Sequence, residues 1–299
     1  MNLRDLRYLV AVADTRHFGK AAERCHVSQP TLSAQIKKLE GYLGVELIER
    51  NPRGVVLTEV GAELVTRARR VLRDSDEIVN LARDFRDPLA GKLAMASIPT
   101  IGPYLLPVVA RKLRKQLPHL QLMLYEYQTD ALLRRLRDGE IDLGILALPV
   151  DLEGLEVKEL YREDFVMALP ANHELAKKPS VKLSDLSGED LLLLEDGHCL
   201  RDQALEACSR VDVNENQDYR ATSLETLRQM VASGWGVTLL PKFATSGPFA
   251  AGAGIVVKAF PRPAPHRLVG AVWRKSSTRI LAIKAICEIV GTTVKAKAE

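Results

Sequence analysis

Four cysteines are the residues of this chain with the most reactive side chains: Cys25, Cys199, Cys208 and Cys287. They form no C-x-x-C pair and have no histidine-rich neighbourhood, so their spacing does not suggest zinc or another metal. In a long chain expected in the cytoplasm, they do not form a secreted disulfide framework either. Any disulfide would therefore be a regulated one, made when a thiolate is oxidised to a sulfenic acid and a second thiol captures it.

Cys199 has the sequence context of a reactive thiol. An apolar run over residues 191–194 leads through a Gly-His turn to Cys199, and residues 200–207 are mostly good helix formers. Cys199 is therefore expected at a helix N-terminus, where backbone N–H groups favour the thiolate. Arg201 close by, and a protonated His198, would favour the thiolate further.

Cys208 is the obvious candidate for the second thiol, but a helix keeps it apart from Cys199. Nine residues at ~1.5 Å each put the two Cα atoms roughly 13 Å apart, whereas a disulfide tolerates at most about 7 Å. The bond would therefore require this segment to unwind or move. The alternative, which the spacing alone favours, is that both cysteines are small buried side chains. Cys25 and Cys287 have no such context and are expected to be packing residues.

Length and composition indicate the class of protein and the number of domains. At 299 residues the chain exceeds what one compact core usually organises, so two or three domains are expected. The composition is that of a globular protein, and no apolar run approaches the roughly 20 residues of a membrane span. Charges stand near the N-terminus where a signal peptide needs its apolar centre, which predicts a cytoplasmic protein without a membrane partner. A net charge of +4 permits a nucleic-acid partner without requiring one.

The first part of the chain has the pattern of a small helical DNA-binding domain. Two apolar helices are followed by Ser28, which can cap a third helix beginning at Pro30. A helix-turn-helix reads DNA because short polar side chains of its second helix reach base edges in the major groove. The candidates for DNA contact are Gln29, Thr31, Ser33 and Gln35 for bases, Lys37, Lys38, Arg50 and Arg53 for phosphates, and Pro30 at the start of the helix. On spacing alone, a polar surface on a helical bundle is an equally good interpretation.

The helix that follows has the repeat of a dimerisation seam. No glycine or proline interrupts residues 62–87, and apolar or small residues recur at alternating spacings of four and three. The seam consists of Leu64, Ala68, Val71, Ser75, Ile78, Ala82 and Phe85. The repeat predicts a partner helix; the alternative is an amphipathic helix lying on its own domain, because the seam includes a serine and two alanines.

Beyond Pro88, short strands alternate with helices, which is typical of an α/β domain. Strands are expected at 92–97, 120–127, 141–148, 165–168, 191–194, 237–240, 255–259 and 268–273. Helices are expected at 104–116, 130–138, 224–233 and 279–290.

The N-terminal sequence closely resembles the signature of the LysR-type transcription regulators. The resemblance lies in the runs FGKAAER (18–24), VSQPTLSAQIKKLE (27–40), LGVELIER (43–50) and LTEVG (57–61). It implies a winged helix-turn-helix over residues 1–58, with its core at about Phe18–Lys37 and a wing near 51–56 that carries Arg53 toward DNA.

The same resemblance implies the organisation of the whole chain. A linker helix over 59–87 would join two subunits, and residues 88–299 would form a regulatory domain shaped like a periplasmic binding protein. Its two subdomains are expected at about 88–163 with 268–299, and at 164–267. The expected fold class is therefore α+β and multidomain, with an all-α winged N-terminal part and a C-terminal α/β part.

A second resemblance concerns the cysteines. The run LLLLEDGHCLRDQALEAC (191–208) is similar, nearly residue for residue, to the redox segment of the peroxide-responsive activators of this family. It implies that Cys199 attacks peroxide and Cys208 resolves the product. It also implies that Thr100, Thr129 and His198 gather around Cys199 to hold or polarise peroxide, with Arg267 as a basic neighbour.

Three classes of function remain open on the sequence. The first is a DNA-binding redox sensor that mainly activates an oxidative-stress response, and the second is a regulator with a small-molecule inducer between the subdomains. The third, a thiol peroxidase, would not need a DNA-binding domain, so we expect no enzyme, and no cofactor or metal. The expected partners are double-stranded DNA, further copies of the chain in dimers and dimers of dimers, RNA polymerase, and a glutaredoxin- or thioredoxin-type reductant.

Overall fold

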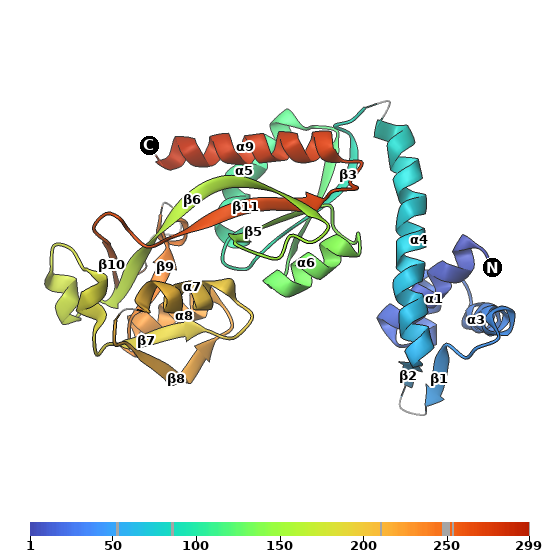
Figure 1. The fold of residues 1–299 in the computed structure, drawn as a ribbon, viewed down its shortest axis with the longest axis horizontal. Helices are drawn as coiled ribbons and strands as arrows, with labels where there is room; N and C mark the ends of the chain where they lie inside the picture. The colour runs from blue at the N-terminus through green and yellow to red at the C-terminus, as the bar shows by residue number, and fades with distance from the viewer. Residues whose placement is uncertain (52–53, 85–86, 210, 247–251, 253, 299) are drawn as a thin grey trace. The chain divides into compact units, whose positions relative to one another are not determined.

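The structure is a computed structural model that describes residues 1–51, 54–84, 87–209, 211–246, 252 and 254–298. The chain divides into two compact units, Met1–Arg86 and Asp87–Glu299. The first unit contains the N-terminal helices and the long helix that follows them, and the second contains the α/β part (Figure 1). None of the helices among the described residues is both long and apolar enough to cross a membrane.

The first unit has the elements of a winged helix-turn-helix followed by a long helix. The elements are α1 (Leu3–Thr15), α2 (Phe18–Arg24), α3 (Gln29–Leu43), β1 (Ile48–Asn51), β2 (Gly54–Leu57) and α4 (Glu59–Asp84). The N–H of Thr31 donates to Ser28 Oγ over 3.3 Å, and Pro30 lies in the first turn, so α3 begins as the sequence predicts. Leu9, Leu32 and Ile36 are buried in one core that joins α1 to α3.

Helix α4 buries the first part of its apolar stripe within its own unit. Ala68 is only 3% exposed and Leu64 packs beside it against the core of the helix-turn-helix. Further along the same stripe, Val71 is 45% exposed and Ile78 is 71% exposed. The seam expected from the sequence is therefore divided: its beginning is covered by the same chain, and its middle is free for a second one. The side chains of its last two positions, at 82 and 85, lie outside the described residues.

Charged residues on the free part of this stripe should prevent dimerisation. We expect the double variant Val71→Glu, Ile78→Glu to sediment as a folded monomer and to bind DNA weakly, because an apolar helix seam cannot bury paired charges. Val79 is 55% exposed beside the stripe, so Val79→Glu is the matched control and should leave the dimer intact. Sedimentation at micromolar concentration measures both, and a monomeric unsubstituted protein would contradict the prediction.

The second unit is built on one sheet with helices around it (Figure 1). The strands of this sheet run in the order β10 (Ile255–Ala259), β6 (Leu155–Pro170), β11 (His266–Arg274), β5 (Leu143–Leu148), β3 (Gly91–Ser97) and β4 (Leu120–Glu126), and β9 (Thr238–Pro241) also pairs with β6. Strands β3, β4 and β5 are parallel, whereas β6 and β11 are antiparallel to their neighbours. A separate parallel pair is made by β7 (Asp190–Leu194) and β8 (Asn214–Ala221).

Two apolar cores lie along this sheet. The helices of the unit are α5 (Gly102–Gln116), α6 (Thr129–Arg137), α7 (Cys199–Cys208), α8 (Leu224–Ala232) and α9 (Ile280–Ala298), with 3-10 turns η1 (Glu174–Lys177), η2 (Leu183–Leu186) and η3 (Lys242–Thr245). The first core gathers buried residues of β3, β5, β11, α5 and α9, and the second gathers those of β7, β9, α8 and the end of β6. Because β6 crosses from one core to the other, it connects the two halves of the unit directly.

The structure differs from the expected strands in two places. Strand β6 begins at Leu155, ten residues before the expected 165–168, and β8 was not expected at all. Both segments are rich in charged or polar residues: LEVKELYRED opens β6, and β8 reads NENQDYRA. Such strands bury few side chains and leave no apolar alternation in the sequence, which is the signal used to recognise a half-buried strand.

Candidate functional site

The two candidate redox cysteines lie at opposite ends of one intact helix. Helix α7 begins at Cys199 and ends at Cys208, and both thiols are free. At 3.6 residues per turn, nine residues rotate the side chain by about 900°, so the two thiols point to opposite faces of α7. Their surroundings agree: Cys199 packs against the first core, and Cys208, 2% exposed, is buried in the second. A bond between them therefore requires α7 to unwind.

Cys199 opens onto a small pocket where three segments of the chain meet. The pocket is lined by Ile98, Pro99, Thr100, Gln128, Thr129, Gly197, His198 and Cys199. These residues come from the turn after β3, the start of α6 and the start of α7. The pocket encloses about 160 Å³ even when its open mouth is included. Sites for small organic ligands usually occupy roughly 300–1,000 Å³, so an ordinary metabolite does not fit beside this thiol.

Arg267 supplies a buried positive charge next to this pocket. Its Nη1 donates to Thr100 Oγ1 and its Nη2 donates to the Thr100 carbonyl oxygen, each over 2.9 Å. Its Nε donates to Glu163 Oε2 over 2.8 Å, and the two side chains are only 1% and 3% exposed. Glu163 Oε1 also accepts from the N–H of Phe243 over 2.9 Å. The guanidinium is thus fixed from several sides, with its charge held close to Cys199.

Burial and this charge act in opposite directions on the Cys199 thiol. Burial raises the pKa of Cys199, while the positive charge of Arg267 and a hydrogen bond from the Thr129 hydroxyl lower it. Burial prevails, so the pKa remains above that of a free thiol and the thiolate is the minor form near neutrality. Among the four cysteines, Cys199 is the one that has a side-chain hydroxyl donor to its sulfur.

The raised pKa of Cys199 predicts a steep pH dependence of its oxidation. Because the thiolate is the nucleophile and is the minor form below the pKa, the second-order rate with peroxide should rise about tenfold per pH unit through the neutral range. Thr129→Val should raise the pKa further and slow the reaction at every neutral pH. Stopped-flow oxidation over a pH series measures this, and a rate that is flat with pH would mean that the thiolate is already formed.

Burial raises the pKa of the other three cysteines as well, so Cys199 is distinguished by its hydroxyl donor and by the buried charge of Arg267. Burial raises the pKa of Cys208 to about 11, and it raises the pKa of Cys287 to about 11 although Lys158 opposes it. Burial also raises the pKa of Cys25. Cys25 packs against the core of the helix-turn-helix, and Cys287 is buried in the first core of the α/β unit. Both were expected to be packing residues.

His198 lies in the pocket as a neutral side chain. It is 5% exposed, and burial lowers its pKa even though Glu195 and Glu126 act against that shift. Its Nε2 lies 3.2 Å from Gln128 Nε2, where a neutral imidazole can accept from the amide. The expectation that a protonated His198 favours the thiolate is therefore wrong, because burial disfavours the imidazolium.

The start of α3 presents the candidate DNA contacts of the first unit. Gln29, Pro30, Thr31 and Lys37 are exposed, whereas Ser33 and Gln35 are half-buried. Thr31 Oγ1 lies 2.7 Å from Ser28 Oγ, which ties this hydroxyl to the helix cap. The side chain of Arg50 and the whole of Arg53 lie outside the described residues, so the wing is represented here by the backbone pairing of β1 with β2.

Comparison with known proteins places both units in one family. Residues 3–62 match the bacterial regulatory helix-turn-helix proteins of the lysR family, and residues 86–295 match the LysR substrate binding domain. The chain belongs to the LysR family. It is 47% identical to the DNA-binding transcriptional dual regulator OxyR of Escherichia coli K12, over 93% of this chain and 90% of that protein. It is 40% identical to the hydrogen peroxide-inducible genes activator of Haemophilus influenzae, over 99% of this chain and 98% of that protein.

Two solved OxyR structures are similar to this LysR-family chain. A cysteine variant of full-length OxyR from Pseudomonas aeruginosa matches with a TM-score of 0.78 and 42% identity, over 97% of this chain and 98% of that one. A cysteine variant of Corynebacterium glutamicum OxyR with bound H2O2 matches with a TM-score of 0.68 and 36% identity, over 99% and 93% of the two chains. The expected winged helix-turn-helix and α/β regulatory fold are confirmed by these matches.

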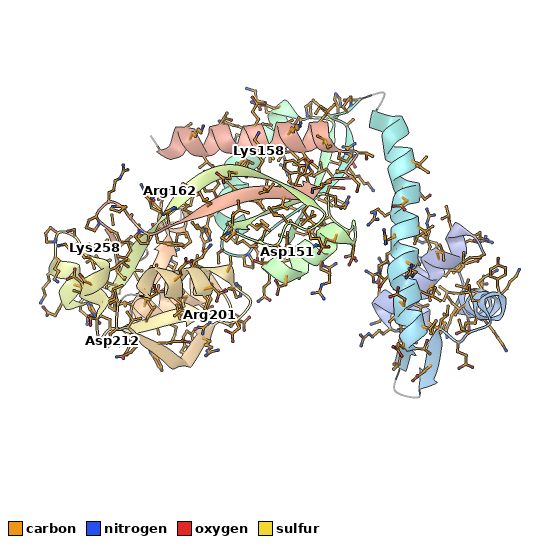
Figure 2. All side chains as sticks on the ribbon, viewed as in Figure 1. Asp151, Lys158, Arg162, Arg201, Asp212 and Lys258 are labelled. Carbon is orange, nitrogen blue, oxygen red and sulfur yellow. The ribbon has the colours of Figure 1, made fainter. Side chains whose placement is uncertain are left out.

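In this LysR-type regulator, Arg201 does not act on the thiol as the sequence suggested. Its Nε lies 2.9 Å from Asp196 Oδ1 and its Nη2 lies 2.8 Å from Glu215 Oε1, so it holds the start of α7 to β8 (Figure 2). The positive charge that lowers the pKa of Cys199 is that of Arg267. The sequence neighbour is displaced because a side chain two positions along a helix points to a different face from Cys199.

The resemblance implied four residues around Cys199, and the sequence analysis missed two others. Thr100, Thr129 and His198 line the pocket and Arg267 lies behind Thr100. Gln128, which contacts His198, and Glu163, which holds Arg267, were not candidates. Glu163 lies in the charged half of β6, the segment not recognised as a strand, so no pattern in the sequence indicated that its carboxylate is buried.

Proposed function

We propose that this LysR-type regulator senses hydrogen peroxide by forming a reversible disulfide between Cys199 and Cys208. The observation that carries the proposal is that one helix has these two thiols at its ends, and that Cys199 is the one served by a buried guanidinium and a hydroxyl donor. The broader role, DNA-binding regulation of transcription in the oxidative-stress response, follows from the family and from relatives that are hydrogen peroxide-inducible activators.

The chemistry takes two steps. The Cys199 thiolate attacks one oxygen of H2O2, the O–O bond breaks, and the leaving hydroxide takes a proton to become water, which leaves Cys199 as a sulfenic acid. The Cys208 thiol then attacks the Cys199 sulfur, forms the S–S bond and releases a second water. Two electrons from a glutaredoxin- or thioredoxin-type thiol reductant return both cysteines to thiols.

Around Cys199, the pocket residues have distinct tasks. Thr129 donates a hydrogen bond to the sulfur and stabilises its negative charge. Thr100, whose hydroxyl accepts from Arg267, can donate its own proton to a peroxide oxygen. Arg267 stabilises the charge that moves from sulfur to the leaving oxygen. Neutral His198 closes the pocket wall and contacts Gln128.

Helix α7 is anchored by few fully buried side chains and by the ion pairs of Arg201, and both must be released when the helix is remodelled after oxidation. Its buried side chains are Leu200, Ala204 and Cys208, four residues apart along one face. A buried leucine contributes about 1.5–3 kcal/mol and an alanine less, so the apolar anchorage of this helix is small. Unwinding α7 would bring Cys208 out of the second core toward Cys199, and the change in this segment is the signal passed to DNA.

A metabolite-responsive regulator was the second candidate. The space beside Cys199 is too small for an ordinary inducer, which argues against a metabolite at this site. Support for peroxide comes from the thiol and its partners Thr129 and Arg267, not from the size of the space. A thiol peroxidase would consume peroxide repeatedly, whereas a sensor must persist in its oxidised form. We propose that the protein acts in the cytoplasm as a dimer and dimer of dimers on double-stranded DNA, where it contacts RNA polymerase.

Peptide mapping tests the disulfide directly. The full-length protein is reduced, desalted, given a several-fold excess of H2O2 over chains, alkylated and digested without reductant. We expect one new species, the peptide pair joined through Cys199 and Cys208, and consumption of about one peroxide per chain before the loss stops. Continuing loss of peroxide in the presence of thiol, without accumulation of this bond, would favour the enzyme and overturn the proposal.

The DNA contacts proposed for α3 separate into two kinds. Ser33→Ala should lower the ratio of specific to non-specific binding, because a hydroxyl that meets a base edge discriminates between sequences. Lys37→Ala should weaken both kinds of binding and reduce the salt dependence, because an exposed lysine meets phosphate. Binding titrations at several salt concentrations measure both effects. An unchanged ratio in Ser33→Ala would place a different face of α3 against the bases.

A further inference from the structure

A second, larger pocket lies in the α/β unit away from Cys199. Val108 of α5 and Val294 of α9 form part of its wall, together with Tyr161 of β6 and Phe243 of η3. The Tyr161 and Phe243 rings are in contact, with centroids 6.1 Å apart. The pocket holds about 240 Å³, whereas the space at Cys199 does not admit a water-sized molecule. It lies just below the usual size of organic-ligand sites, so it suits only a small ligand.

The mouth of this pocket is positively charged. Arg162, Lys242 and Arg262 line it, and Figure 2 shows Arg162 on β6. Arg162 has a carboxylate partner, Asp164, at 3.5 Å. Within the described part of the chain, neither Lys242 nor Arg262 forms an ion pair. The remaining carboxylate of the pocket is that of Glu163, which is already neutralised by Arg267.

We propose that this pocket binds a small carboxylate carried on a flat apolar body. Two valines and two aromatic rings suit such a body, and Lys242 with Arg262 offers charge-assisted hydrogen bonds to the carboxylate. A neutral ligand of the same shape would leave both cations unpaired, and a phosphate without an apolar body would leave the rings and valines exposed to water. The charge and the apolar wall together therefore specify the ligand class.

The pocket is connected to the redox site through one carboxylate. Glu163 lines the pocket, accepts from the N–H of Phe243 over 2.9 Å, and accepts from Arg267 Nε over 2.8 Å. Arg267 in turn holds Thr100 and lowers the pKa of Cys199. A ligand that packs on Phe243 and pairs with Lys242 stabilises η3 and so the arrangement of Glu163 and Arg267 found in the reduced protein. Occupancy of this pocket therefore slows formation of the Cys199–Cys208 bond. This coupling rests on the function proposed above.

Binding is tested first, on the reduced full-length protein, so that its result does not depend on the redox proposal. Phenylacetate is the probe and phenylacetamide is its neutral match. By calorimetry we expect saturable binding of phenylacetate at one site per chain, and binding at least about tenfold weaker for phenylacetamide and for the Lys242→Gln variant. Lys284→Gln removes the same charge from an exposed position of α9 and should bind as the unsubstituted protein does.

Val108→Trp, at a half-buried position of the pocket wall, should fill the pocket and abolish binding while the protein stays folded. Absence of saturable phenylacetate binding, or binding that Lys242→Gln and Val108→Trp leave unchanged, would overturn the site. The coupling is tested by following disulfide formation by mass after one equivalent of H2O2. Saturating phenylacetate should slow it in the unsubstituted protein and not in Val108→Trp. Equal rates would overturn the coupling alone, and failure to form the disulfide without any ligand would overturn the proposed function while leaving the binding result in place.

Discussion

Cys199→Ser is expected to abolish the response to peroxide completely. A serine hydroxyl is not ionised near neutrality and cannot form the sulfenic acid, so neither the disulfide nor the change in α7 follows. The fold should be retained, because serine is only slightly smaller than cysteine and the position is half-buried. Reporter transcription and mass analysis after peroxide measure the loss, and a residual response in this variant would show that another thiol senses peroxide.

The other cysteines provide the controls for this variant. Cys208→Ser should still be oxidised at Cys199 and should accumulate a sulfenic acid or a mixed disulfide, since the resolving thiol is absent. Cys25→Ala and Cys287→Ala should respond as the unsubstituted protein does, because both side chains pack in apolar cores and neither lines the pocket at Cys199. If Cys208→Ser showed no oxidation at Cys199 after peroxide, the assignment of attacking and resolving cysteines would be wrong.

Arg267→Met is expected to have the largest effect on stability. It leaves Glu163, with a side chain 3% exposed, as a buried carboxylate without its partner, and breaking such a pair costs about 3–5 kcal/mol. It also removes the positive charge that lowers the pKa of Cys199, so oxidation should slow at neutral pH. Urea unfolding of the variant measures the first effect, and oxidation below the unfolding transition measures the second.

A second variant separates these two effects of Arg267. The double variant Glu163→Gln, Arg267→Met removes both charges and should recover much of the free energy of unfolding, because no buried charge is left unpaired. Its oxidation should remain slow, because the guanidinium beside Cys199 is still missing. If the double variant were oxidised at the normal rate, the role of Arg267 would be to hold the structure and not to act on the thiol.

The sequence predicted the features that depend on local patterns. Ser28 and Pro30 indicated the start of α3, and the Gly-His turn before Cys199 indicated the start of α7, because the residues that cap a helix are its neighbours in the sequence. The apolar strands were recognised because a run of apolar residues is also a local pattern. Domain boundaries within the chain stay as predictions, and the two cores found in the second unit are compatible with two subdomains.

What the sequence could not predict is the environment made by distant segments. Glu163 and Arg267 lie on paired strands β6 and β11, more than a hundred residues apart in the chain, and form their ion pair only in the folded sheet. The neutral state of His198 and the raised pKa of Cys199 likewise come from burial between several elements. Its position near Cys199 in the sequence suggested that Arg201 favours the thiolate, but in the structure this side chain forms ion pairs with Asp196 and Glu215.

The most direct test of the account compares one DNA footprint in two redox states of the same sample. The full-length protein is bound to operator DNA under thiol reductant and again after one equivalent of H2O2, and the Cys199–Cys208 bond is mapped in an aliquot of the second. The account predicts that the footprint changes together with appearance of the bond, that transcription rises, and that both return on reduction. An unchanged footprint and unchanged transcription in a sample that contains the mapped bond would contradict the mechanism.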